Sequence, residues 1–372
     1  MEIQQKSLQI ICLQTSLTQY HYQSYSILKN YLLKRIHLGI KSQLPTNKNL
    51  FNEVRAQNPT LVILPESTGA WLYLMCVPMP QFLRNYFFNY RNIKTNRHLL
   101  FITYTLITHI RLYFKEIYRN YHSKCTWVGL IQHSWFSLFA EQTYSIYKKL
   151  FSELACETNT TIVAGSIFTY DNSSIKNKLQ NISYVFEPNN GSICLQSGKQ
   201  YPTSEESHFI DCYKQPPSIY SIPNTNIDIG VLVCADSWMP QVYEEYSKIE
   251  LDPNRRFLYI IVALSTGEWN TPWPGYDTNV DIPKDVDNKH LTTFSLPKAW
   301  FHYAVNRGFN VLSKRNDLAG YGIVCCQGVL NIMNDIQAQG ESIILIKRSK
   351  TEASILYEAN IYEDEKILTC EF

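Results

Sequence analysis

Three reactive side chains follow apolar, strand-like runs, each at the point where the run gives way to turn residues. Glu66 comes directly after LVILP, Lys199 lies in SGKQYPTSEE, and Cys234 follows the run GVLV at 230–233. In α/β sheets, functional residues lie where strands end and loops begin. We therefore expect a carboxylate, an ammonium and a thiol to converge at one edge of a sheet.

The chemistry of this trio is coherent. A thiol attacks a carbonyl or nitrile carbon as the thiolate, and its ordinary pKa is about 8.5, so it needs a base. Glu66 can take the proton, and Glu66 and Lys199 would keep each other ionised. The ammonium would stabilise negative charge that develops on the substrate. If Cys234 lies on a tight strand-to-helix turn, the backbone N–H of Ala235 is a second donor.

Each residue also has an unreactive interpretation. A cysteine that ends an apolar strand is usually an inert core residue. Glu66 alone could be a helix-capping or turn residue, and Lys199 alone a solvated loop charge. The chemistry of the three residues leaves these alternatives open.

Three segments, LVILPES, GKQYPTSEE and GVLVCADSWMP, resemble in this order the signature segments of the nitrilase superfamily, the carbon–nitrogen hydrolases. Weaker similarities in IICLQ, TTIVAGSIF, AVNRGFNVLSKRN and GVLNIM extend the resemblance over most of the chain. It implies an α/β fold, a four-layer α-β-β-α sandwich. It also implies the catalytic residues Glu66, Lys199 and Cys234, and a supporting glutamate at Glu206, with Glu205 as the competing choice.

The function implied by the resemblance is a thiol-dependent hydrolase. It would cleave a non-peptide C–N bond, in an amide or alternatively a nitrile, through a covalent thioester on Cys234. An N-acyltransferase with the same Glu-Lys-Cys site and a non-catalytic binding relative are the alternatives, and the intact trio favours the enzyme. The short acidic tail, without a synthetase domain, favours a stand-alone amidase-like or nitrilase-like hydrolase. No cofactor and no metal are expected.

Composition limits the partners and the compartment. The chain has 372 residues, 45% of them hydrophobic, which is enough for one large α/β domain. A net charge of +2 and the lack of a basic run argue against nucleic acid. Ten cysteines without a CxxC motif indicate neither a disulfide framework nor a zinc site, but reduced thiols. We expect a cytoplasmic homo-oligomer without a secretory signal, acting on a small molecule. Four N-x-S/T triplets are attributed to chance, at Asn159, Asn172, Asn181 and Asn190.

Strand-like and helix-like segments alternate along the chain, which predicts a single α/β domain over 1–372 with about ten strands. Helices are expected at 25–36, 139–156, 242–249 and 297–308. Strands are expected at 7–17, 59–67, 160–168, 181–196 as a hairpin, 226–236, 257–265, 309–316, 322–333, 342–348 and 353–361.

One segment, at about 72–138, is longer than the family pattern provides for and is rich in aromatic residues, arginine and histidine. Because it follows Glu66 directly, we expect it near the mouth of the pocket, as a lid or substrate platform. An oligomer or membrane contact is the alternative. The run HLLFITYTLITHI at 98–110 is too short to span a bilayer, and a packed helix is favoured over an interfacial one.

Overall fold

The computed structural model describes residues 6–42, 58–77, 80, 104, 118, 127–170, 178–277, 279–332 and 336–372. Most of the expected insertion at 72–138 lies outside these ranges, including the run at 98–110 except residue 104, and the lid stays a prediction. Among the helices in the described ranges, none combines the length and the hydrophobicity needed to cross a bilayer.

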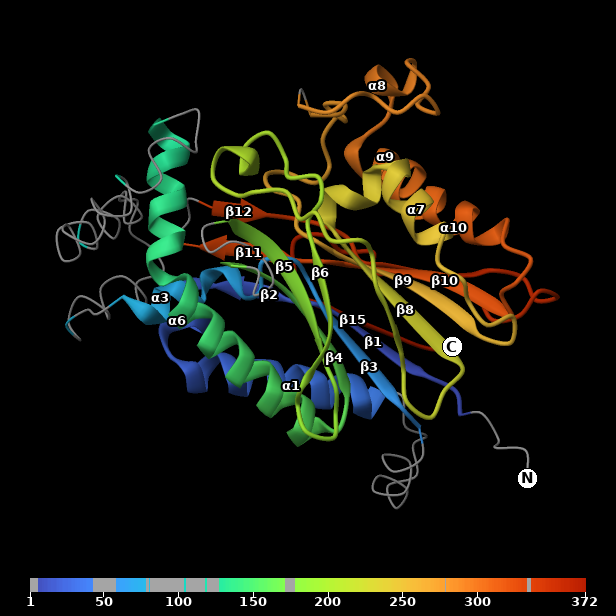
Figure 1. The fold of residues 1–372 in the computed structure, drawn as a ribbon, viewed down its shortest axis with the longest axis horizontal. Coiled ribbons are helices and arrows are strands. Elements are labelled where there is room, and N and C mark those ends of the chain that lie inside the picture. Colours follow the sequence, from blue (N-terminus) through green and yellow to red (C-terminus); the bar gives the residue numbers. More distant parts are fainter. Residues whose placement is uncertain are drawn as a thin grey trace.

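Two six-stranded sheets form the centre of the molecule (Figure 1). The first contains, in spatial order, β15 (Lys366–Glu371), β1 (Gln9–Gln14), β3 (Thr60–Leu64), β4 (Thr161–Tyr170), β5 (Leu179–Phe186) and β6 (Ile193–Gly198). The second contains β14 (Ile355–Glu358), β13 (Ile343–Lys347), β10 (Gly320–Gln327), β9 (Arg256–Ala263), β8 (Ile227–Val233) and β7 (Ile219–Ser221). Strands β1, β3 and β4 of the first sheet are parallel to one another, and so are β8, β9 and β10 of the second. Within each sheet, the carboxyl ends of these three strands therefore lie at the same edge.

The two sheets pack face to face through alternate residues of their strands. Ile10 and Cys12 of β1 share one apolar cluster with Ile229, Val231 and Val233 of β8. The intervening residues of these strands face the helices instead, so the parallel strands are buried on both sides. This explains why their sequences are nearly continuous apolar runs rather than alternating ones.

Helices cover the outer faces of both sheets (Figure 1). Helices α1 (Tyr25–Ser42) and α6 (Trp127–Thr158) pack on the first sheet, and α7 (Pro240–Ser247) and α10 (Asn306–Ser313) on the second. In α1, Leu28, Leu32 and Ile36 are spaced by four residues and form the buried face. The four layers are the α-β-β-α sandwich that the resemblance implied.

Shorter elements complete the fold. A three-stranded sheet contains β12 (Ile336–Ala338), β11 (Val329–Ile332) and β2 (Ser16–Thr18). The short helices are η1 (Gln19–Gln23), η3 (Ala70–Leu72), α3 (Tyr73–Cys76), η4 (Glu206–His208), η5 (Cys234–Trp238), α8 (His290–Thr293), α9 (Leu296–Trp300) and the π-helical η6 (Phe301–Val305). Both described ends of the expected insertion belong to the core, because Leu72, Leu74 and Trp135 are buried there.

The predicted strand at 309–316 is wrong. Residues 306–313 form α10, which continues the helical stretch of α9 and η6. Gly308 is buried inside this helix, and a Cβ there would lie 2.6 Å from Cε1 of Tyr243 and 2.7 Å from Cδ1 of Ile323. The glycine therefore permits close packing on β10 and does not end the helix. The described ranges also contain fifteen strands rather than about ten. The strands β7, β12 and β15 were not predicted, and the predicted strands at 7–17 and 322–333 are each divided into two.

Candidate active site

Cys234 lies at the sharp turn between β8 and η5. Its φ of 47° is in the left-handed region, which a side chain other than glycine rarely adopts, so the backbone is strained there. The hydroxyl of Ser237 donates to the carbonyl of Cys234 at 2.6 Å, and the thiol lies 3.8 Å from the carbonyl oxygen of Leu264. Ala235 is the second residue of η5, and the first N–H groups of a helix have no acceptor within it.

Glu66 directly follows Pro65 at the end of β3, and an irregularity in β4 holds this turn in place. The pairing of β4 with β5 shifts between Val163 and Ser166. Gly165 lies in this shift with a φ of 68°, and a Cβ there would lie 2.1 Å from the carbonyl oxygen of Pro65. The hydroxyl of Ser166 accepts the N–H of Ser67 at 3.0 Å. Glycine is thus required where the two segments meet, and the glutamate has a fixed backbone.

Lys199 lies between two carboxylates. Its Nζ atom is 2.9 Å from Oε1 of Glu66 and 2.7 Å from Oε2 of Glu206. Lys199 is only 1% exposed and Glu66 only 4%. Glu206 also accepts the N–H of Thr203 at 3.0 Å, whereas Glu205 is exposed. Of the two glutamates that the sequence left open, Glu206 is the one that contacts the lysine.

The charges in this cluster control one another. Burial alone would lower the pKa of Lys199, but Glu206 and Glu66 outweigh it and hold the pKa well above its ordinary value. Burial raises the pKa of Glu66, and Glu206 raises it further, while Lys199 acts in the opposite direction. The lysine is therefore a permanent cation, and the glutamate is more basic than an exposed one. A raised pKa suits a carboxylate to general-base catalysis near neutral pH.

The thiol of Cys234 belongs to the same electrostatic cluster. Burial raises its pKa strongly, Glu66 raises it further, and Lys199 lowers it. A hydrogen bond with Cys234 is also among the interactions that lower the pKa of Glu66. The resting sulfur is consequently a neutral thiol, and its proton must be transferred when it attacks.

Sequence reasoning missed Asp236, which connects the two turns. It is 2% exposed and lies two residues after Cys234. Its Oδ1 atom accepts the N–H groups of Gln200 at 2.9 Å and Tyr201 at 2.8 Å, directly after Lys199. Burial raises the pKa of Asp236 to about 7, against the lowering effect of those N–H groups. The only sequence signal for this role was the aspartate in CADSWMP. A sequence does not distinguish a buried carboxylate from an exposed one in a turn.

A buried arginine supports the far end of η5. Arg307 pairs with Asp285 through two nitrogen–oxygen contacts of 2.8 and 2.9 Å, and it also donates to the carbonyl of Trp238. The ring of Trp238 stacks on that of Trp273 with centroids 5.7 Å apart. Tryptophans near the predicted site differ in their burial. The structure buries Trp269 and Trp273 in packing, leaves Trp71 and Trp238 partly exposed, and does not describe the side chain of Trp127.

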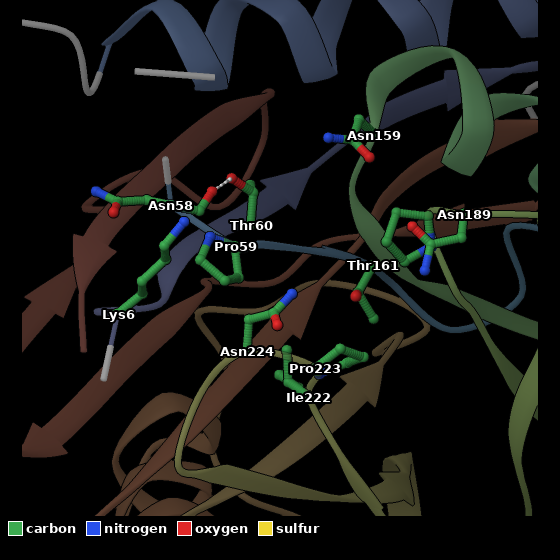
Figure 2. A pocket seen from close by; sticks show the side chains of 11 residues that line it. Lys6, Asn58, Pro59, Thr60, Asn159, Thr161, Asn189, Ile222, Pro223 and Asn224 are labelled. Carbon is green, nitrogen blue, oxygen red and sulfur yellow. Dashed lines mark hydrogen bonds between the residues drawn. The ribbon is translucent and has the colours of Figure 1, made fainter. Parts of the chain in front are cut away.

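A polar pocket of about 150 Å³ lies elsewhere, where β3 and β4 begin (Figure 2). Among the described residues that line it, Lys6 alone is ionisable. Asn159 and Asn224 have φ values of 51° and 61°, which asparagine adopts in turns. The lining therefore consists of loop and turn residues and the first residues of β3 and β4, and it contains none of the predicted catalytic residues. Across the described part of the chain, no three His, Cys, Asp or Glu side chains are arranged to hold a metal ion.

Comparison with solved structures finds members of the nitrilase superfamily, the family that the three motifs resemble. Nit3 of Saccharomyces cerevisiae, from branch 10 of the superfamily, has a TM-score of 0.49 and 14% identity, over 100% of this chain and 92% of that one. A mutant of the Nesterenkonia AN1 amidase has a TM-score of 0.47 and 10% identity, over 98% and 91%. Another mutant of that amidase, carrying acrylamide on its active-site cysteine, has a TM-score of 0.47 and 10% identity, over 97% and 92%.

No protein-family model matches the chain, and no curated protein sequence is significantly similar to it. With 10–14% identity and TM-scores below 0.5, these similarities carry no conclusion about the chain. Any proposal about the reaction must therefore be argued from the residues of this chain.

Proposed function

We propose that the protein is a carbon–nitrogen hydrolase that cleaves a small amide through a thioester on Cys234. One observation carries the proposal: the Lys199 ammonium is buried between Glu66 and Glu206, in the cluster that includes the Cys234 thiol. The buried charges of Lys199 and Glu66 are not required for stability, since apolar residues of similar volume are often as stable.

The first half of the reaction uses each group once. The sulfur of Cys234 forms a bond to the amide carbon while its proton passes to Glu66. Lys199 and the N–H of Ala235 stabilise the oxyanion. When the intermediate collapses, the C–N bond breaks, and the amine leaves with the proton from Glu66. The product of this half is a thioester on Cys234.

The second half regenerates the thiol. Water attacks the thioester carbon while Glu66 takes its proton. The C–S bond then breaks, and the sulfur recovers a proton from Glu66 as the carboxylic acid forms. The raised pKa of Glu66 suits both directions of proton transfer, because a carboxylate with an ordinary pKa would be a weak base at neutral pH.

The experiment is a turnover assay on a panel of aliphatic and aromatic amides and nitriles, with release of ammonia or amine as the readout. We expect the wild type to cleave at least one amide and Cys234→Ala to cleave none. Cys194→Ala is the control, because Cys194 is a partly buried cysteine in β6, outside the cluster. A Cys234→Ala variant that retains full turnover would contradict the mechanism.

A further inference from the structure

Asn181 lies in the candidate site, although the sequence marked it only as part of an N-x-S triplet. It is in β5 and 1% exposed, which excludes glycosylation of the folded chain. Its backbone carbonyl accepts the N–H of Lys199 at 2.8 Å, so it is the neighbour of the lysine across the two strands.

The side-chain amide of Asn181 contacts both carboxylates that hold Lys199. Its Nδ2 atom donates to Oε1 of Glu66 at 2.8 Å and to Oε1 of Glu206 at 3.5 Å. Two carboxylates require a donor, so the NH₂ end of the amide must face them. The Oδ1 atom is buried and has no hydrogen-bond partner among the described residues, which is unfavourable. The contacts with the two glutamates therefore explain why an asparagine occupies this position, whereas stability of the strand does not.

These contacts divide the two oxygens of Glu66 between different tasks. Oε1 receives hydrogen bonds from both Asn181 and Lys199. Oε2 receives neither of these bonds, so we infer that a proton from Cys234 passes to this oxygen. An amide fixes the orientation of the carboxylate without adding a second positive charge, which would make Glu66 a weaker base.

We propose that Asn181 is a positioning residue, which clamps Glu66 and Glu206 around Lys199 and orients Glu66 toward the thiol of Cys234. This inference rests on the proposed function, because it assigns Asn181 a role in the activation of that thiol.

The test measures how fast iodoacetamide, an alkylating agent that is itself a primary amide, labels Cys234 between pH 5 and 9. Peptide mass spectrometry follows each cysteine separately, and exposed Cys212 is the internal reference. Asn181→Leu removes the donor at similar volume. Ser183→Ala is the matched control, because Ser183 is on the same face of β5 and its buried oxygen also has no hydrogen-bond partner in the described ranges.

For Asn181→Leu we expect labelling at pH 7 to slow by about ten- to a hundredfold, the range for a hydrogen bond to a charged group. The pH profile should move to higher pH, because Glu66 loses a donor that favours its ionised form. Ser183→Ala should keep the wild-type rate and profile. If circular dichroism shows that the leucine variant is unfolded, the isosteric variant Asn181→Asp is tested in its place. Its pH profile should shift further to higher pH, because the added carboxylate raises the pKa of Glu66.

A folded Asn181 variant with the wild-type rate and profile would overturn the clamp and leave the proposed function standing. If Cys234 of the wild type is labelled no faster than Cys212, the proposed function fails instead, and the inference falls with it.

Discussion

The Nζ atom of Lys199 lies 2.9 Å from Oε1 of Glu66, and both side chains are almost completely shielded from water. The two residues come from the ends of different strands, 133 positions apart in the chain. Removing one partner of such a pair leaves an uncompensated buried charge, which is strongly unfavourable. Lys199 lowers the pKa of Glu66 and Glu206 raises it. Removing one or the other should therefore shift this pKa in opposite directions.

Lys199→Met should reduce turnover by about a hundred- to a thousandfold, the typical effect of removing one preorganised donor to an oxyanion. The loss should appear mainly in kcat, because the charge that Lys199 stabilises develops in the transition state. Without the cation the pKa of Glu66 rises, so the low-pH limb of the pH–rate profile moves to higher pH. Lys214→Met, at an exposed lysine farther along the same loop, is the control. A near-normal rate with an unchanged pH–rate profile would show that Lys199 takes no part in the reaction.

Glu206→Gln should lower the rate by about tenfold through loss of a charge-assisted hydrogen bond to Lys199. It should move the low-pH limb in the opposite direction, to lower pH. Glu206 raises the pKa of Glu66, so its removal makes Glu66 easier to ionise. Glu205→Gln is a matched control at the exposed neighbour and should leave the profile unchanged. Equal effects of the two substitutions would contradict the assignment of Glu206 as the supporting residue.

Asp236→Asn should change the pH dependence of stability. The pKa of Asp236 is raised to about 7 in the folded protein, so the folded state holds its proton more tightly than the unfolded state does. The stability that this proton contributes is full below about pH 4, the ordinary pKa of an aspartate, and is lost as the pH rises through about 7. The asparagine variant lacks this loss, which is on the order of 2–4 kcal/mol.

Urea unfolding of the wild type and Asp236→Asn at pH 5 and pH 8 tests this relation. The free energy of unfolding of the variant minus that of the wild type should be larger at pH 8 than at pH 5. A constant difference between the two proteins would show that Asp236 has the same pKa in the folded and unfolded states.

Gly165→Ala should lower both stability and activity. The φ of 68° alone costs about 1 kcal/mol for a residue with a Cβ, and the contact with the Pro65 carbonyl adds to it. Gly267→Ala is the control, since Gly267 has a φ of 87° but no described atom within 4 Å of the place that a Cβ would take. Thermal unfolding should show the larger loss for Gly165→Ala, and only that variant should slow turnover by displacing Glu66. Equal losses at both positions would mean that backbone strain alone is responsible.

The residues that carry the proposed chemistry could be predicted from sequence because each lies at a strand end, in a segment that resembles a signature segment of a known family. Glu66, Lys199 and Cys234 each follow a strand, and the structure brings all three together. Asn181 and Asp236 could not be found in this way. Asn181 lies inside a strand, and Asp236 lies in a turn where an aspartate is ordinary, so their roles depend on partners distant in sequence.

The layers of the fold were predictable for a similar reason, since α1 and the parallel strands follow the helical and buried-strand patterns. Residues 309–316 show the limit of such patterns. The short run FNVLS is compatible with a strand or a helix, and Gly308 suggested a helix end. Only the close packing of Gly308 against Tyr243 and Ile323 shows that the helix continues.

The central claim, a covalent thioester on Cys234, is tested most directly by peptide mass spectrometry after acid quenching of the enzyme during turnover of an amide that it cleaves. We expect the mass of the acyl group on the peptide that contains Cys234, and its release as a hydroxamic acid when hydroxylamine is added. Cys234→Ala should carry no adduct. An amide that is turned over while no acyl group is ever found on Cys234, or one found on another cysteine, would contradict the account.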